Sequence, residues 1–183
     1  MLELTGKNII VTGAASGIGR ATAILLSRLG ANLILFDLND DGLKNTNEMI
    51  KSETGRECFL YNFDLTDFEK LEYTFSNEKS NFGKLHGLVH CAGIPSMIPL
   101  RALTNEDYER VHKINALTGL NLAKLFSKRG TFDSNATCSM VFIASVYALV
   151  GTTANIAYAM SKAAVIGMTR ALAVELAPKK NSC

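Results

Sequence analysis

The chain lacks the features that mark proteins working in membranes, on nucleic acids or outside the cell. No apolar run approaches the roughly 20 residues that span a bilayer, and the early acid Glu3 is not followed by the long apolar core of a secretory signal. The formal net charge is only +2 and no basic run occurs, so neither a nucleic-acid partner nor a membrane partner is indicated. We expect a cytoplasmic protein that acts on a small molecule.

The sequence also lacks closely spaced pairs of cysteines. No Cys-x-x-Cys pair occurs among the four scattered cysteines, which are Cys58, Cys91, Cys138 and Cys183. Reduced thiols explain that pattern most simply. Because His86, His90 and Cys91 lie in an apolar run that predicts a buried strand, we assign them structural roles and expect no metal site.

Short β-branched runs alternate with longer helical patterns along the chain. Strands are predicted at residues 7–12, 31–36, 57–62, 85–91 and 140–144. Helices are predicted at 17–29, 41–53, 67–81 and 156–177, with a further long helix beginning at Thr104, where Thr104-x-x-Asp107 resembles a capping box. Alternation of this kind predicts βαβ units, and near-continuous apolar strands indicate helices on both faces of a parallel sheet. We predict one domain, residues 1–183, with a doubly wound Rossmann fold in three α/β/α layers.

A glycine-rich turn separates the first predicted strand from the first predicted helix. Its sequence is Thr12-Gly13-Ala14-Ala15-Ser16-Gly17-Ile18-Gly19. Gly13 allows a tight turn, Gly17 lets the backbone approach a ligand, and Gly19 lets the helix pack onto the strand. The helix N-terminus then offers N–H groups and a partial positive charge to a pyrophosphate. Between a strand and a helix, such a turn predicts a dinucleotide site.

Asp37 ends the second predicted strand, eighteen residues beyond Gly19. An acid at this point can accept both hydroxyls of an adenosine ribose, and its charge repels a 2′-phosphate. Positions 16, 37 and 38, from which a Lys or Arg could contact a 2′-phosphate, carry Ser16, Asp37 and Leu38 instead. The nearby Arg20 lies inside the helix. We therefore predict NAD rather than NADP. The structural alternative is a loop acid that caps the next helix.

Tyr158 and Lys162 stand four residues apart in the last predicted helix. Residues at i and i+4 share a helix face. A free Tyr has a pKa of about 10, and a neighbouring cation lowers it, so the phenol can exchange a proton with an alcohol or carbonyl oxygen. The alternative is an ordinary surface pair on an amphipathic helix.

Taken together, these residues resemble the short-chain dehydrogenase/reductase family of the Thr-Gly-x-x-x-Gly-x-Gly type, from Lys7 to Pro178. The matching features, in chain order, are the Gly13–Gly19 turn, Ala92-Gly93, Asn115 in the long helix, Ser145, and Tyr158-x-x-x-Lys162. Ser145 precedes Tyr158 by thirteen residues, a spacing typical of the family.

The resemblance implies a role for each matching side chain. Tyr158 is the general acid or base, Lys162 lowers the pKa of Tyr158 and binds the nicotinamide ribose, Ser145 orients the substrate carbonyl, and Asn115 holds a water that relays protons. Asp64 matches the family acid near the adenine. The implied cofactor-binding residues are Gly13, Ser16, Gly17, Ile18, Gly19, Asp37, Asp64, Leu65, Cys91, Ala92, Gly93, Tyr158 and Lys162.

The implied activity is interconversion of a secondary alcohol and a ketone with NAD(H), by a homodimer or homotetramer built through the fourth and fifth helices. Substrate classes by resemblance include 3-oxoacyl thioesters, steroids, sugars and polyols. Each side chain also has a structural alternative: Ser145 as a strand-end serine, Asn115 as a helix-surface residue and Asp64 as a turn former.

Two departures from the family pattern qualify this expectation. Cys91 replaces the usual Asn before Ala92-Gly93, and because a thiol is a weaker hydrogen-bond partner we expect local loosening there. The sequence stops at Cys183, whereas relatives continue into a sixth strand, a substrate lid and a seventh strand. We then expect strand 140–144 to be an exposed edge, and the alternative function is a catalytically impaired dinucleotide-binding protein, partner subunit or regulator.

Overall fold

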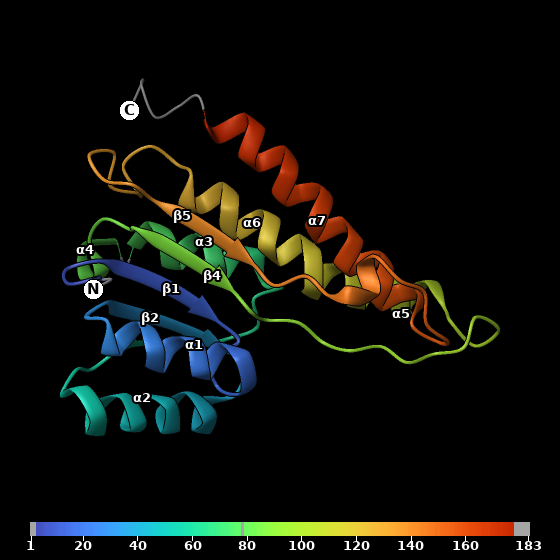
Figure 1. Ribbon diagram of the computed structural model, residues 1–183, viewed down its shortest axis with the longest axis horizontal. Coiled ribbons are helices and arrows are strands. Elements are labelled where there is room, and N and C mark those ends of the chain that lie inside the picture. The colour runs from blue at the N-terminus through green and yellow to red at the C-terminus, as the bar shows by residue number, and fades with distance from the viewer. Residues whose placement is uncertain (1–2, 78, 178–183) are drawn as a thin grey trace. The chain divides into compact units, whose positions relative to one another are not determined.

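The computed structural model describes residues 3–77 and 79–177 and contains a five-stranded sheet flanked by helices (Figure 1). The strand order is β3-β2-β1-β4-β5, and every strand pair whose register is defined is parallel. The strands are β1 (Asn8–Thr12), β2 (Asn32–Asp37), β3 (Phe59–Asn62), β4 (Gly87–His90) and β5 (Ser139–Phe142). This is the predicted Rossmann-type architecture, and β5 is the outermost strand on its side.

The residues group into two compact units. The first comprises Met1–Ala92 and Ala123–Val141, and the second comprises Gly93–Leu122 and Phe142–Cys183. The first unit holds β1 to β4 and most of β5, whereas the second holds the helix that carries Tyr158 and Lys162. The two units are described in turn.

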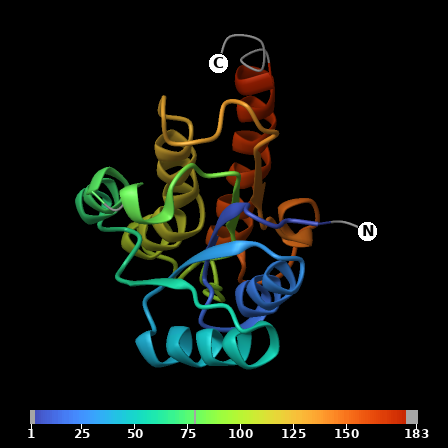
Figure 2. The ribbon, with the colours of Figure 1, turned by 90° about the vertical axis from the view of Figure 1, so that its left-hand side faces the viewer.

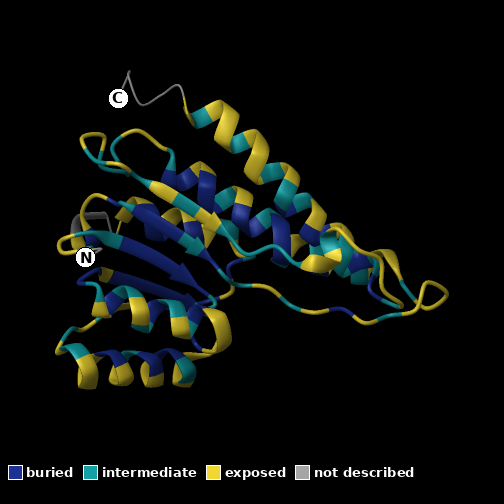
Figure 3. Cartoon of the chain, viewed as in Figure 1, coloured by how far each residue is buried: buried dark blue, intermediate teal, exposed yellow. Residues whose placement is uncertain are grey.

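Helices α1 (Gly17–Arg28) and α2 (Asp40–Thr54) cover one face of the sheet in the first unit and lie side by side in Figures 1 and 2. Successive side chains of a strand point to opposite faces, and β2 follows this rule. Leu33 and Leu35 join a buried cluster that includes Leu43 and Ile50 of α2. Figure 3 shows the result, with β1 and β2 largely buried and with α1 and α2 exposed on their outer sides.

The opposite face of β2 packs against aromatic residues from α3 (Phe68–Asn77). The Phe36 ring stacks on Phe75 with centroids 6.4 Å apart and meets Phe63 edge to face at 5.7 Å. Asp67 caps this helix by accepting a hydrogen bond from Lys70 N at 3.0 Å. The helix predicted at 67–81 is described as α3 and the short α4 (Lys79–Phe82), and residue 78 between them lies outside the described residues.

The second unit contains α5 (Asn105–His112), the π-helical turn η1 (Lys113–Leu117), the 3₁₀ turn η2 (Val146–Ala148) and α7 (Ile156–Leu176). Helix α6 (Thr118–Phe126) begins in this unit and ends in the first. Thr104 and Asp107 form the predicted capping box. Over the described stretches, none of the helices has the length and apolar character needed to cross a membrane.

Candidate active site

The glycine-rich turn of the first unit folds tightly onto its own strand. A Cβ atom on Gly19 would lie 2.1 Å from the Gly13 carbonyl oxygen, so any side chain there would force the helix away from the strand end. Gly13 has a φ of +67°, and a Cβ on it would lie 2.8 Å from Ala92 N. The turn and the segment after β4 therefore approach one another through backbone alone.

The N-terminus of α1 is left uncovered by its own side chains. Ser16 makes no side-chain capping bond, and no acid stands in the first turn of the helix. Gly17 has a φ of +51°, yet a Cβ on it would meet nothing within 4 Å. The space beside the Gly17 Cα is thus unfilled by the protein, and the partial positive charge of the helix end fits a pyrophosphate.

The Asp37 carboxylate links β2 to the glycine-rich turn. Its Oδ2 accepts a hydrogen bond from Ala15 N at 3.0 Å, and its Oδ1 accepts one from Asn39 N at 2.9 Å. The cap of α2 is Asn39, whose side chain accepts from Gly42 N at 3.0 Å, so Asp37 is not the helix cap. Each carboxylate oxygen can accept a second bond, and this arrangement fits the two hydroxyls of a ribose.

Arg20 is the cation nearest in sequence to this turn, and its guanidinium is held by the protein. It donates to the Ala15 carbonyl oxygen and, through Nε, to Thr46 Oγ1 at 3.0 Å. Thr46 is fully buried and in turn donates to Ala14 O at 2.9 Å. These contacts hold the Arg20 guanidinium against the Ala15 carbonyl and the Thr46 side chain.

The segment after β4 is fastened by Thr12. Its hydroxyl oxygen accepts from Ala92 N at 3.2 Å and lies 2.7 Å from Nδ1 of the buried His90, while its carbonyl accepts from Cys91 N at 3.3 Å. Thr12 thus hydrogen-bonds to the backbone at the point where Cys91 replaces the family Asn. These bonds oppose the expected local loosening.

Asp64 and Leu65 follow β3. Asp64 Oδ1 accepts from Thr66 N at 2.8 Å, and the Asp64 carbonyl accepts from Asp67 N at 2.9 Å. Asp64 is therefore a turn former, as its structural alternative states, and its exposed carboxylate can contact a ligand as well. Leu65 is buried, so its side chain belongs to the core.

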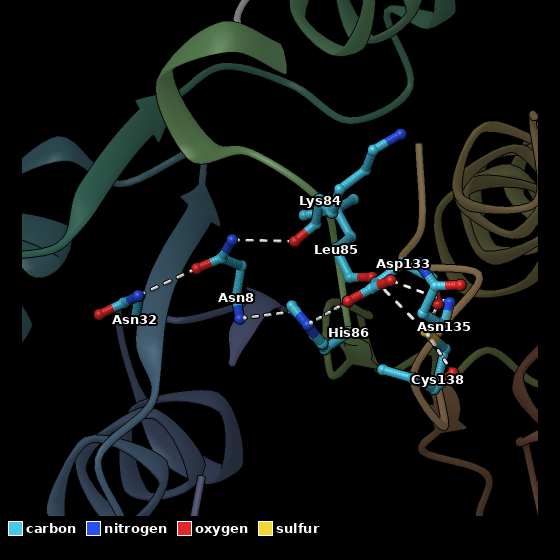
Figure 4. Close-up of polar contacts among 9 residues, drawn as sticks. Asn8, Asn32, Lys84, Leu85, His86, Asp133, Asn135 and Cys138 are labelled. Atoms are coloured by element: carbon cyan, nitrogen blue, oxygen red, sulfur yellow. Dashed lines mark hydrogen bonds and ion pairs between the residues drawn. The ribbon is translucent and has the colours of Figure 1, made fainter. Parts of the chain in front are cut away.

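His86 belongs to a polar network at the other end of β4 (Figure 4). Its Nδ1 accepts from Asn8 N at 3.1 Å, and its Nε2 lies 3.3 Å from Asp133 Oδ2. Cys138 donates to Asp133 O at 3.3 Å, and burial raises the pKa of its thiol. The network attaches the segment after α6 to the sheet, which is a structural role.

Asn115 lies in the π-helical turn of the second unit and is almost fully buried. Its Oδ1 accepts from Ile94 N at 2.7 Å, while its Nδ2 donates to Ile94 O and to Ser161 Oγ, both at 3.0 Å. Asn115 is thus not a helix-surface residue. Its amide joins the segment that follows Gly93 to helix α7.

Lys162 is also buried, with 5% of its surface exposed. Its Nζ donates to Ile143 O at 2.7 Å and lies 5.9 Å from the centroid of the Tyr158 ring. A Cβ built on Gly93 would lie only 3.5 Å from this ammonium. The pair is therefore not an ordinary surface pair, because a buried cation is held beside the phenol ring.

Ser145 stands two residues beyond Ile143 and begins η2. Its Oγ accepts from Tyr147 N at 3.2 Å, which uses an oxygen lone pair and leaves the hydroxyl hydrogen to be donated. The Tyr147 ring meets the Tyr158 ring edge to face, with centroids 6.4 Å apart and an interplanar angle of 79°. The strand end, η2 and α7 thus converge on Tyr158.

Sequence reasoning missed three contributors to this arrangement. Ser161 is fully buried and donates to Tyr158 O at 2.7 Å while accepting from Asn115; its place beside Lys162 was the available signal. The Ile143 carbonyl and the Tyr147 ring gave no signal, because each acts through the course of the backbone after β5.

A model of the short chain dehydrogenase family matches residues 7–181. The chain belongs to the short-chain dehydrogenase family. One relative of this dehydrogenase is the 2,5-dichloro-2,5-cyclohexadiene-1,4-diol dehydrogenase of Sphingobium indicum, which is 33% identical over 176 residues, or 96% of this chain and 68% of the relative.

Two solved structures resemble the dehydrogenase closely. Carveol dehydrogenase from Mycobacterium avium in complex with NAD has a TM-score of 0.89 at 25% identity, covering 97% of this chain and 68% of that one. A short-chain dehydrogenase from Shigella flexneri complexed with NADP has a TM-score of 0.87 at 29% identity, covering 96% of this chain and 74% of that one. Relatives of this dehydrogenase thus bind either dinucleotide.

Proposed function

We propose that this dehydrogenase interconverts a secondary alcohol and a ketone with NAD(H). The observation that carries the proposal is the bond from Lys162 Nζ to Ile143 O, which buries a cation beside the Tyr158 ring. A dinucleotide-binding protein or partner subunit without turnover has no need of a buried ammonium next to a phenol. The alcohol-specific names of two relatives support the same reading.

Tyr158 is assigned the proton transfer. Its phenolate oxygen takes the alcohol proton during oxidation, and its hydroxyl gives a proton to the carbonyl oxygen during reduction, which leaves the phenolate. The Lys162 ammonium stabilises the phenolate that forms, since opposite charges attract strongly away from water. Ser145 donates its hydroxyl hydrogen to the substrate oxygen and thereby orients it.

Asn115 is assigned a positioning role together with a water relay toward Lys162. Both of its amide hydrogens are donated, to Ile94 O and Ser161 Oγ. It therefore fixes the segment after Gly93 against α7.

The bound nicotinamide would supply or accept the hydride. In the first unit we assign the pyrophosphate to Gly13, Ser16, Gly17, Ile18 and Gly19, the adenosine ribose to Asp37, and the adenine to Asp64 and Leu65. The backbone of Cys91, Ala92 and Gly93 would line the nicotinamide side, and Tyr158 and Lys162 would bind its ribose.

Asp37 and the engaged Arg20 favour NAD over NADP, because a 2′-phosphate would meet a carboxylate and no available guanidinium.

We also propose a cytoplasmic homo-oligomer. The described cysteines, Cys58, Cys91 and Cys138, form no disulfide bond, as suits a reducing compartment. In the second unit, a largely apolar groove of about 340 Å³ runs between η1 and α7 and is lined by Leu117, Leu120, Met168 and Leu172 among others. Burial of such a groove against a second copy would stabilise a dimer or tetramer.

Replacing Tyr158 with Phe tests the proposed reaction. The variant keeps the ring but loses the hydroxyl that exchanges the proton. We expect turnover of an alcohol panel, followed by NADH absorbance, to fall by roughly 10²- to 10⁴-fold, with NADH affinity retained in a fluorescence titration. Turnover equal to the parent would overturn the assignment, and Tyr73→Phe on α3 is the matched control.

A further inference from the structure

Two segments of the second unit, residues 93–100 and 142–157, border the Tyr158–Lys162 turn. The first is bonded through Ile94 to Asn115, and Ile98 N donates to Ala154 O at 2.7 Å, which ties it to the second. The second segment begins at the end of β5, whose Ile143 carbonyl holds Lys162. Both segments are therefore fixed to the same residues that surround the phenol.

These segments expose large apolar side chains. Met97 is 78% exposed and Leu149 74% exposed, values that are high for residues of this kind. We call the following set the apolar rim: Met97, Leu100, Val146, Tyr147, Leu149 and Val150. A contiguous exposed apolar patch commonly marks a binding surface, and these side chains stand on segments that are fixed to the residues around the phenol.

The same segments carry no charge. Neither 93–100 nor 142–157 contains an Asp, Glu, Lys, Arg or His, and Lys162 itself is buried. A carboxylate or a phosphate against these segments would find no cationic side chain of theirs to pair with, and a ring bearing many hydroxyls would lose hydrogen bonds to water wherever it packed on the apolar rim. Segments 93–100 and 142–157 thus select against charged and polyhydroxylated substrates.

Tyr147 is the rim residue with a defined relation to the reacting group. Its ring stands edge to face against Tyr158 and is 39% exposed. An apolar carbon skeleton whose oxygen meets the Tyr158 hydroxyl can pack on this ring.

We infer that the substrates are neutral secondary alcohols and ketones carried on an apolar ring or chain, and that Tyr147 sets this preference by contacting the carbon skeleton. The inference rests on the proposed alcohol–ketone function and names its substrate class. It excludes sugars, polyols and anionic hydroxy acids as preferred substrates.

The test uses three probes built on one ring: cyclohexanol, myo-inositol and 3-hydroxycyclohexanecarboxylate. Binding to the whole chain with NAD⁺ present is measured by ligand-observed NMR, and turnover by NADH absorbance. We expect cyclohexanol to bind at least roughly tenfold more tightly than either of the other probes and to give the highest kcat/KM. Binding or turnover of the polyol or the anion within threefold of cyclohexanol overturns the inference, as does a failure of all three probes to bind.

Variants of Tyr147 test whether this residue sets the preference for apolar substrates. Tyr147→Ser should weaken cyclohexanol binding and kcat/KM by roughly three- to tenfold, whereas Tyr147→Phe, which keeps the ring, should weaken them less than Tyr147→Ser does. Tyr73→Ser, an exposed Tyr on α3, is the matched control and should leave both values unchanged. If Tyr147→Ser leaves the preference intact, Tyr147 does not set it.

The two proposals fail in different ways. Preferential cyclohexanol binding with no turnover of any probe would contradict the proposed reaction and support the substrate class. Turnover of all three probes without preference would support the reaction and contradict the substrate class.

Discussion

Lys162 donates from Nζ to the main-chain oxygen of Ile143 at 2.7 Å, so a side chain of α7 is anchored to the backbone that leaves β5. The anchor holds the ammonium beside the Tyr158 ring, 5.9 Å from its centroid. A neutral residue of similar length would fill the space without supplying either the charge or the bond.

Lys162→Met should therefore reduce turnover far more than it reduces stability. We expect kcat to fall by about 10²-fold or more, because the phenolate loses its neighbouring cation. The rate is measured by NADH absorbance and the fold by thermal unfolding. Lys124→Met, at an exposed position on α6, is the control; if Lys162→Met keeps the parent rate, the charge has no catalytic role.

Asp37→Ala should narrow the preference for NADH over NADPH. The substitution removes a carboxylate that fits a ribose and repels a 2′-phosphate, and loss of such charge-assisted bonds costs about 1.5–3 kcal/mol. We expect NADH affinity to fall by roughly tenfold or more while NADPH affinity stays level or rises, as measured by fluorescence titration. Asp40→Ala, in an exposed ion pair with Lys44, should change neither affinity. Equal affinities for both dinucleotides in the parent would contradict the NAD assignment.

Two helical glycines should respond to alanine in opposite directions. At Gly19 a Cβ would lie 2.1 Å from Gly13 O, so Gly19→Ala should destabilise the protein by roughly 1–3 kcal/mol or more. At Gly167 a Cβ meets nothing within 4 Å, so Gly167→Ala should stabilise α7 by about 0.5–1 kcal/mol. Chemical denaturation of both variants beside the parent measures the difference, and a Gly19→Ala variant as stable as the parent would refute the tight turn.

Cys58 should be a poorly reactive thiol in the folded protein. Burial, and to a lesser extent the charge of Glu57, raise the pKa of Cys58 to about 12. At pH 8 only about one thiol in 10⁴ would then be ionised, and the thiolate is the reactive form. Alkylation with iodoacetamide followed by peptide mass spectrometry should leave Cys58 unmodified in the native protein and modified after unfolding. Equal labelling before and after unfolding would show that burial does not protect it.

The order of strands and helices was predictable because each element has a clear hydrophobic period and ends at a glycine, a cap or a loop. The glycine-rich turn was predictable for the same reason. The π-helical turn at Lys113–Leu117 was not, because apolar spacing hardly separates an i+5 bond from an i+4 bond.

For the candidate site, the sequence pattern named candidate side chains but did not predict which groups hold them in place. Asn115 bonds to the backbone of Ile94, and Lys162 bonds to the backbone of Ile143. A carbonyl or an amide is present at every residue, so no residue type marks the one that will be used. The same limit applies to Asp37, whose bond to Ala15 N depends on how the turn folds back.

The network around His86 fixes where that ring carries its proton. A main-chain N–H can only donate, so the bond from Asn8 N requires Nδ1 to be the accepting nitrogen. The hydrogen of the neutral ring must then sit on Nε2, pointing at Asp133. The tautomer of His86 thus depends on its contacts with both Asn8 and Asp133. The nitrogen chemical shifts of His86 would therefore report whether β1 and the segment beyond α6 are joined.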